Sequence, residues 1–294
     1  MLHVRGGISL THTVIVTDST SDIPEELAKS LGIHVVPLRL QFGDESFLDG
    51  VEISAKEFYE RLGQAEQLPT TSQPSPADYV RVYEQIQQEL PGASILSIHI
   101  SSALSGTYQS ALIAKSMMNE NVDLTVVDSL SASYGFGLLV VHAARLARQV
   151  MAVEDIVVAV EQMRKGRKLY FLVDTLEYLQ KGGRIGKAAA LFGTLLNIKP
   201  ILSIDQDGII YPVEKVRGRK KAIARMIELF QQDLGNIETI NVAVGHTANP
   251  ESAEPFLEEL SGHYKLEEVV LTNIGSVVGS HVGTGTIGIF IWPA

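Results

Sequence analysis

Short apolar runs alternate with longer stretches of helical period along the first half of the chain. The apolar runs are rich in Val, Ile and Leu and are bounded by polar or glycine-containing segments, which is typical of buried strands. Strands are expected at residues 13–17, 33–42, 93–100 and 124–127. Helices are expected after Pro24, at residues 55–62, 76–90 and 106–118, and in two stretches that reach about residue 165. This alternation predicts a mostly parallel sheet covered by helices.

Local start signals support three of these helices. Pro24 stands at a first helical position, where the missing backbone N–H costs nothing. Ser54 and Glu57 have the spacing of a capping box. In such a box, the side chain of each residue accepts a hydrogen bond from the backbone N–H of the other. Ser75 precedes Pro76 as an N-cap residue would.

The second half of the chain has a different pattern, with fewer regular alternations. It predicts a strand at 168–173, helical segments broken at Gly182-Gly183, a hairpin of 201–204 and 209–216 around Asp207-Gly208, a helix, two strands separated by a helix that begins at Asn249-Pro250, and a glycine-rich end. The predicted fold class is therefore α/β, with two α/β domains at residues 1–160 and 161–294. The first domain is expected to hold the mostly parallel sheet.

The composition is that of a globular protein large enough to bury a substantial core. The 294 residues are 45% hydrophobic and 20% charged, and they include no Cys, which excludes disulfides and thiolate chemistry. We see no apolar run long enough to span a bilayer, and residues 1–11 lack the apolar region of a signal peptide. The sequence therefore predicts a soluble, cytoplasmic protein.

Charge is distributed unevenly along the chain. The formal net charge is −10, which argues against a general nucleic-acid-binding function. Residues 164–225 nevertheless contain 14 Lys and Arg against 5 Asp and Glu, a net charge of +9 that leaves −19 for the remainder. Such a basic segment on an acidic protein indicates a specific anionic ligand or partner, and the alternative is a set of ordinary solvated helix faces.

Three polar clusters stand next to predicted strands and helices, at residues 70–75, 101–107 and 280–285. In an open parallel sheet such loops gather at the carboxyl ends of the strands, where ligands bind. Helix N-termini there offer free N–H groups, and hydroxyls with a glycine complete an anion cradle. The alternative for each cluster taken alone is an ordinary helix cap.

The chain resembles the DegV family, the fatty-acid-binding subunits of bacterial fatty acid kinases. The matching segments are VTDSTSDIP (16–24), TSQPSP (71–76), SSALSGTYQSA (101–111), VVDS (126–129), KGGRI (181–185), KP (199–200), VRGRKKA (216–222) and SHVGTGTIG (280–288). These segments run nearly end to end in one order. The resemblance implies two α/β domains with a lipid between them.

The resemblance also implies a set of site residues. The fatty acid carboxylate is expected to be held by Thr71, Ser105 and His281, with Ser72, Gly106 and Thr107 as further contacts. The lipid would be presented to a separate kinase, which makes the acyl phosphate for phospholipid synthesis. The protein itself would then be a carrier subunit without catalytic residues, metal or cofactor.

Physical chemistry agrees with such a site. Burying about 14 methylene groups is worth roughly 11 kcal/mol before the costs of association. A buried carboxylate must accept hydrogen bonds, or it takes up a proton. Hydroxyls and a neutral imidazole supply donors without a permanent charge, so an acyl phosphate would be released more easily than from a buried Arg.

The expected partners are a long-chain fatty acid and the catalytic subunit of a fatty acid kinase. Arg184 of KGGRI and Arg217 of VRGRKKA lie in the basic segment and are candidates for the kinase-docking face, with structural ion pairs as the alternative. The protein is expected to be a monomer. A transient contact with a membrane surface is compatible with the expected carrier function.

Two other function classes stay open at this point. A serine hydrolase could use Ser105 and His281 on acyl esters, and a lipid-dependent regulatory protein could signal to partners other than a kinase. The stretch 283–288 formally matches GxGxxG, but it leads into a β-branched run, which is the wrong context for a dinucleotide site. Residues 18–20 could bind phosphate or metal, and we expect them instead to cap and turn the chain at the sheet's edge.

Overall fold

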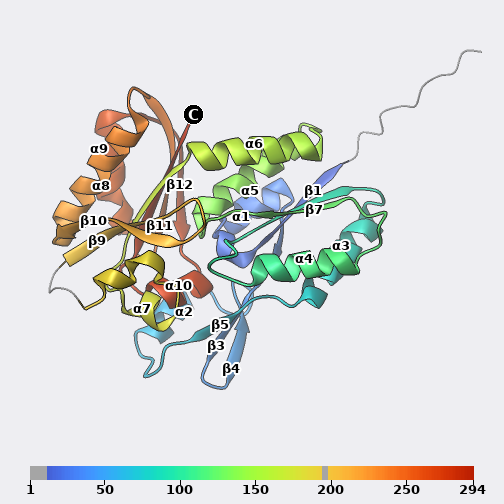
Figure 1. The fold of residues 1–294 in the computed structure, drawn as a ribbon, viewed down its shortest axis with the longest axis horizontal. Helices are drawn as coiled ribbons and strands as arrows, with labels where there is room; N and C mark the ends of the chain where they lie inside the picture. The colour runs from blue at the N-terminus through green and yellow to red at the C-terminus, as the bar shows by residue number, and fades with distance from the viewer. Residues whose placement is uncertain (1–11, 194–197) are drawn as a thin grey trace, which may run out of the picture.

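The computed structural model describes residues 12–193 and 198–294, so the predicted lack of a signal peptide at residues 1–11 lies outside the described residues. The α/β fold class is confirmed, because helices cover both faces of a parallel sheet and a second, mixed sheet lies beside it (Figure 1). The predicted boundary near residue 160 stays a prediction. One continuous core contains residues of both sheets, among them Ile15, Leu96, Phe171 and Phe290.

The first sheet is entirely parallel, with strand order β2-β1-β6-β7. Its strands are β1 (Thr13–Asp18), β2 (His34–Val36), β6 (Ser94–His99) and β7 (Leu124–Asp128). Helices α3 (Pro76–Glu89) and α4 (Thr107–Met117) cover one face, and α1 (Glu25–Leu31) and α5 (Tyr134–Ala147) lie over the other. Val14 and Val16 face α3, whereas Ile15 faces α5, because successive side chains of a strand point to opposite faces. Every residue of β1 and β6 is consequently buried.

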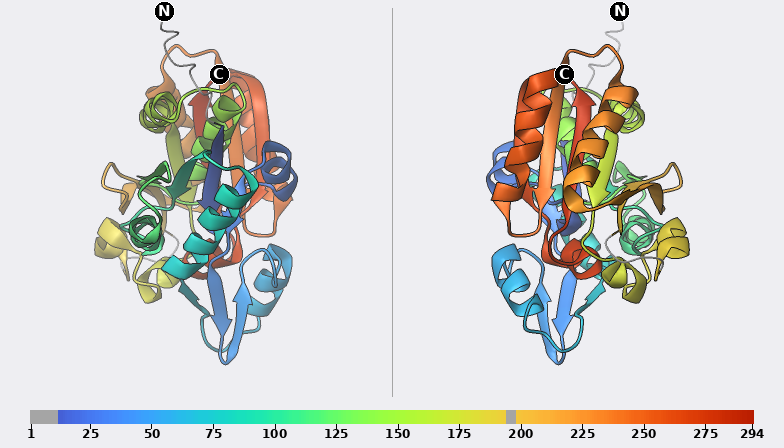
Figure 2. Two further views of the ribbon diagram at one scale, coloured as in Figure 1. Left: turned by 90° about the vertical axis from the view of Figure 1, so that its right-hand side faces the viewer. Right: turned by 90° about the vertical axis from the view of Figure 1, so that its left-hand side faces the viewer.

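The second sheet has six strands in the order β10-β9-β8-β13-β11-β12. They are β8 (Lys168–Leu172), β9 (Ile198–Ile204), β10 (Ile210–Arg217), β11 (Thr239–His246), β12 (Lys265–Asn273) and β13 (Ile287–Pro293). Helices α8 (Arg219–Leu234) and α9 (Glu254–His263) pack on the outer face, with the 3-10 helix η3 (Pro250–Ala253) before α9 (Figure 2). The inner face shares its core with α5 and α6 (Val153–Gly166). The two sheets are therefore joined through these two helices.

A small antiparallel sheet and several short helices complete the structure at the lower edge in Figure 1. The sheet has the order β4-β3-β5, and α2 and α10 pack beside it. These elements are β3 (Arg39–Phe42), β4 (Glu45–Leu48), β5 (Thr70–Ser72), α2 (Ala55–Leu62), α7 (Glu177–Lys181), α10 (Ser276–Val282) and η2 (Gly186–Leu191). The 3-10 helix η1 (Ser19–Ser21) directly follows β1 and contacts α5. The predicted capping box of Ser54 and Glu57 is present at the start of α2.

Three sequence predictions about these elements were wrong. The strand expected at 33–42 is two strands in different sheets, because Pro37 has no N–H for a ladder and the next amide, of Leu38, donates to Ser19 Oγ at 3.1 Å. Residues 70–72, expected in a loop, form strand β5 by pairing with β3. Residues 280–282 of the cluster expected as a loop at 280–285 are instead the last residues of helix α10 (Ser276–Val282).

Candidate functional site

A largely apolar cavity lies where the two main sheets and the small sheet meet. Its empty volume is about 880 Å³, open solvent at its mouth included. Its apolar lining consists of Leu38, Ile100, Leu104, Ala132, Leu169, Phe171, Leu179, Ile204, Ile210, Ile274, Val277, Val278, Val282 and Phe290. Its polar lining consists of Thr71, Ser72, Gln73, Ser105, Ser133, Arg184, His281 and Thr286.

The structure brings Thr71, Ser105 and His281 to this one cavity. Thr71 Oγ1 and His281 Nε2 are hydrogen-bonded at 2.9 Å, although the two residues are 210 positions apart. Ser105 Oγ is 2.8 Å from Thr107 Oγ1 and accepts from the backbone N–H of Thr107 at 3.3 Å. The cavity thus has a small group of hydroxyls and an imidazole on an otherwise apolar wall.

Thr71 owes its position to the small sheet. It pairs with Leu40 in the register of β5 against β3, and Leu40 is fully buried. Its neighbours Thr70 and Ser72 are exposed, whereas Thr71 itself is half-buried. Since alternate residues of a strand face opposite sides, the β5 pairing sends the Thr71 side chain toward the cavity.

Ser105 is held by the loop that joins β6 to α4. The Ser105 backbone N–H donates to Ser101 O at 3.1 Å, and Ser101 Oγ donates to Gly208 O at 3.0 Å in the β9–β10 turn. A Cβ added at Gly106 would lie 3.0 Å from Gln73 Nε2, so the loops that carry Thr71 and Ser105 are in close contact. A larger residue at position 106 would have to displace the end of the Gln73 side chain by a few tenths of an ångström.

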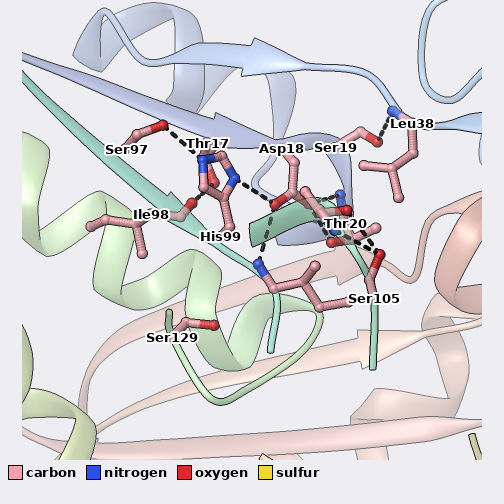
Figure 3. Close-up of polar contacts among 12 residues, drawn as sticks. Thr17, Asp18, Ser19, Thr20, Leu38, Ser97, Ile98, His99, Ser105 and Ser129 are labelled. Carbon is pink, nitrogen blue, oxygen red and sulfur yellow. Dashed lines mark hydrogen bonds and ion pairs between the residues drawn. The ribbon is translucent and has the colours of Figure 1, made fainter. Parts of the chain in front are cut away.

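A buried carboxylate organises the start of the same loop (Figure 3). Asp18 Oδ2 accepts from Ile100 N at 3.2 Å and is 3.0 Å from His99 Nδ1, and Asp18 Oδ1 accepts from Thr20 N at 3.1 Å. Asp18 is also the N-cap residue of η1. Asp18 therefore caps and turns the chain at the end of β1, as expected from the sequence, and ties that end to β6.

The serine hydrolase reading gains no support from this geometry. A Ser–His–Asp chain does exist, since Ser97 Oγ is 2.7 Å from His99 Nε2 and His99 contacts Asp18. All three residues have no exposed surface, and Tyr83 Oη already lies 2.8 Å from Ser97 Oγ, so no substrate reaches them. Among the described residues, no hydrogen bond joins Ser105 to His281, the pair that the hydrolase would need.

His281 is a neutral imidazole at ordinary pH. Burial, with a smaller effect from the Arg184 guanidinium nearby, lowers its pKa from 6.5 to about 4. Its Nδ1 is buried and has no hydrogen-bond partner within residues 12–193 and 198–294. The ring can therefore donate or accept at the cavity wall without carrying charge.

Arg184 lines the cavity, a position that the sequence did not predict. Its Nε donates to Leu104 O at 2.9 Å and its Nη1 donates to Gly182 O at 2.7 Å. The motif KGGRI carries no local signal for this, because only the fold brings α7 next to the loop before Ser105. Arg217, the other docking candidate, is exposed at the end of β10. The docking role of both residues stays a prediction.

The secondary candidates fall into two groups. Ser72 is exposed and lines the cavity beside Thr71. Thr107 is fully buried and contacts Ser105, and Gly106 is the N-cap residue of α4, so these two support the Ser105 loop. Gln73, Ser133 and Thr286 also line the cavity. Gln73 and Thr286 belong to segments that match the family but were not named as site residues, and no local signal marks Ser133.

The described part of the chain contains no cluster of three or more His, Asp or Glu residues that could hold a metal ion. No helix among the described residues is both long and apolar enough to cross a bilayer.

The low pKa of His281 predicts an acid-sensitive contribution to stability. The unfolded chain binds a proton at position 281 near pH 6.5, whereas the folded protein does so only near pH 4. This residue's contribution to the free energy of unfolding is therefore full above pH 6.5 and is lost progressively as the pH falls toward 4. Relative to the wild type, His281→Gln should gain stability over that window in urea unfolding. A constant difference between pH 7 and pH 4 would contradict the shifted pKa.

With the site described, comparison with known proteins assigns the chain to a family. A family model described as "Uncharacterised protein, DegV family" matches residues 12–294. This chain belongs to the DegV family. Protein DegV of Bacillus subtilis (strain 168) is 40% identical over 276 residues, which cover 94% of this chain and 97% of that protein.

Solved DegV structures share the whole fold. The crystal structure of DegV, a fatty acid binding protein from Bacillus subtilis, has a TM-score of 0.88 at 38% identity and covers 97% of this chain and 100% of that chain. A DegV family protein from Thermus thermophilus, solved for its fatty acid binding, has a TM-score of 0.90 at 35% identity with the same coverage. A stearic acid-binding protein from Eubacterium ventriosum ATCC 27560 has a TM-score of 0.86 at 29% identity, over 95% of this chain and 97% of that chain.

Proposed function

We propose that this DegV protein binds one long-chain fatty acid, with its carboxylate at Thr71, Ser105 and His281 and its tail in the apolar cavity. One observation carries the proposal: three side chains from distant parts of the sequence converge on a cavity whose remaining wall is mostly apolar. The fatty acid binding and the bound stearic acid named for the related structures point to the same ligand class.

The chemistry of the lining suits this ligand. Each buried methylene contributes about 0.8 kcal/mol, so a long acyl chain supplies most of the binding free energy. A carboxylate accepts hydrogen bonds and has no donor, which matches the two hydroxyls and the neutral imidazole. The guanidinium of Arg184 adds a positive charge near this group and favours the ionised form of the ligand.

We further propose that the protein is a monomeric carrier that presents the acyl head to a partner fatty acid kinase. It would supply no catalytic residue, and Arg217 on its exposed surface, with Arg184 nearer the ligand, is the candidate for docking. Native mass spectrometry of the purified protein should find about one long-chain fatty acid bound. Adding a fatty acid kinase catalytic subunit and ATP should then produce acyl phosphate. Delipidated protein that binds no fatty acid saturably would end the proposal.

The three head-group residues should behave as one unit. Loss of one hydrogen bond to a charged group costs about 1.5–3 kcal/mol, so Ser105→Ala and His281→Ala should each weaken fatty acid binding roughly ten- to a hundredfold. Because both residues share one acceptor, the double variant should differ from the sum of the single effects. Calorimetric titration with a fatty acid measures the cycle. Strict additivity, with both single variants near wild type, would show that these residues do not meet at one carboxylate.

A further inference from the structure

Helix α10 is anchored at its first turn by two buried carboxylates from the N-terminal part of the chain. Asp49 Oδ1 accepts from the backbone N–H of Ser276 at 3.2 Å and from the Ser276 hydroxyl. Asp22 Oδ1 accepts from Gly275 N at 2.9 Å. Asp22 and Asp49 are both buried, so neither carboxylate is satisfied by bulk solvent.

Further contacts tie the same turn to residues that precede β5. Tyr59 Oη donates to Ile274 O at 2.9 Å, and the hydroxyl of Thr272 donates to Asp22 O. A Cβ added at Gly279 would lie 2.5 Å from Tyr59 Oη, so α10 lies directly against α2. The segment 272–279 is thus restrained along its length by side chains and backbone of residues 22–59.

The restrained helix is the one that carries the head-group imidazole. α10 has only seven residues, and Val277, Val278, His281 and Val282 of this helix line the cavity. A helix this short has little stability of its own and depends on tertiary contacts. Among the described residues, the His281 side chain makes one hydrogen bond, to Thr71. Besides this bond and the contact with Gly182, the position of its ring depends on how α10 is held at its start.

Holding these two carboxylates in a buried position at the start of α10 costs free energy. Burial is the largest effect on both groups and raises the pKa of Asp22 and of Asp49, and the two also repel one another. Hydrogen bonds from Ser133 and Gly275 to Asp22, and from Ser276 and Ser19 to Asp49, offset part of this cost. Asp22 thereby links the start of α5, through Ser133, to the start of α10.

We propose that Asp49, together with Asp22, is a positioning residue that fixes the first turn of α10 and so holds the His281 ring at the fatty acid carboxylate. The inference rests on the proposed function for its ligand, but the placement of the ring can be measured without lipid. Neither aspartate lines the cavity, so each acts through α10 rather than on the ligand.

The test compares a fatty acid with its methyl ester of equal chain length. Both ligands bury the same tail, and only the acid brings a carboxylate to the head-group residues. Asp49→Ala should weaken binding of the acid about tenfold, in line with the loss of one hydrogen bond to a charged group. Binding of the ester should change less than about twofold, because the tail contribution follows buried apolar area. Asp49→Asn keeps one acceptor oxygen and should have an intermediate effect.

A matched control separates positioning from general destabilisation. Asp123 Oδ2 accepts from the hydroxyl of Ser94 at 2.5 Å, and neither residue lines the cavity, so Asp123→Asn alters another carboxylate–hydroxyl hydrogen bond and should leave the acid-to-ester ratio unchanged. Ser276→Ala removes only the hydroxyl bond to Asp49 and serves if Asp49→Ala does not fold. The proposal would be overturned if the variants lost affinity equally for the acid and the ester. It would also be overturned if none of the α10 variants changed either affinity.

NMR of the His281 ring in delipidated protein makes this test independent of the proposed function. The Asp49 variants should move the ring nitrogen signals, whereas Asp123→Asn should not. If wild-type protein bound no fatty acid but the ring still moved, the proposed function would fail and the anchoring of α10 would stand. If the ring did not move in any folded variant, the anchoring would be wrong whatever the protein binds.

Discussion

Replacing Ala132 with Trp is expected to lower fatty acid affinity at least about a hundredfold while the protein stays folded. Ala132 is a small apolar residue on the cavity wall and is only half-buried, so a larger side chain has open space to enter. An indole there would displace several methylene groups of the tail. Four displaced groups at about 0.8 kcal/mol each correspond to roughly 3 kcal/mol, which is more than a hundredfold in affinity. Calorimetric titration with a long-chain fatty acid measures the loss.

A matched substitution on the surface controls for the added bulk. Ala77 is exposed on α3, so Ala77→Trp should leave affinity within about twofold of wild type. Overpacking of the cavity wall should cost Ala132→Trp no more than about 1–3 kcal/mol of stability. Wild-type affinity in a folded Ala132→Trp variant would mean that the fatty acid tail does not use this cavity.

Replacing Gly182 with Ala is expected to reduce fatty acid affinity by roughly ten- to a hundredfold. A Cβ at this position would collide with Nδ1 of His281 and would lie 3.0 Å from Tyr178 O. The imidazole would have to move, which breaks its hydrogen bond to Thr71 and withdraws it from the ligand head. The lost bond to a charged group is worth about 1.5–3 kcal/mol. Titration with the acid and its methyl ester should show that only the acid is affected.

The adjacent glycine is the control for this prediction. Gly183 has φ +71°, and a Cβ there would meet nothing within 4 Å among the described residues. Gly183→Ala should therefore cost stability through backbone strain, of about 1 kcal/mol, without moving His281. Equal effects of the two substitutions on affinity would indicate that backbone strain, and not the collision with His281, controls binding.

Much of the secondary structure could be predicted because its causes lie within a few residues. The capping box of Ser54 and Glu57 and the cap of Ser75 before Pro76 act over three residues, and both are present. The Asp207-Gly208 turn joins β9 to β10, since Gly208 adopts φ +76°. The buried runs of β1 and β6 were recognisable because a strand covered on both faces carries apolar residues at successive positions, as at 14–16 in β1 and 95–96 in β6.

The head-group residues were named from family resemblance, because local pattern could not connect them. Thr71 is on a strand only through its pairing with Leu40, about thirty residues earlier in the chain. His281 is on a seven-residue helix that Asp22 and Asp49 hold from more than two hundred positions away. Short elements have little intrinsic stability, so their formation depends on contacts that a local reading does not contain.

The sequence by itself determined the α/β class, the helix starts and the apolar strands, since hydrophobic period and capping act over short distances. Only the tertiary structure decided that Pro37 sends β2 and β3 to different sheets and that Arg184 lies beside His281. It also decided why position 182 must be glycine: its φ of −74° is open to any residue, but the ring of His281 occupies the space of a side chain. Contacts of this kind depend on the simultaneous packing of distant segments, and so does the volume left between them.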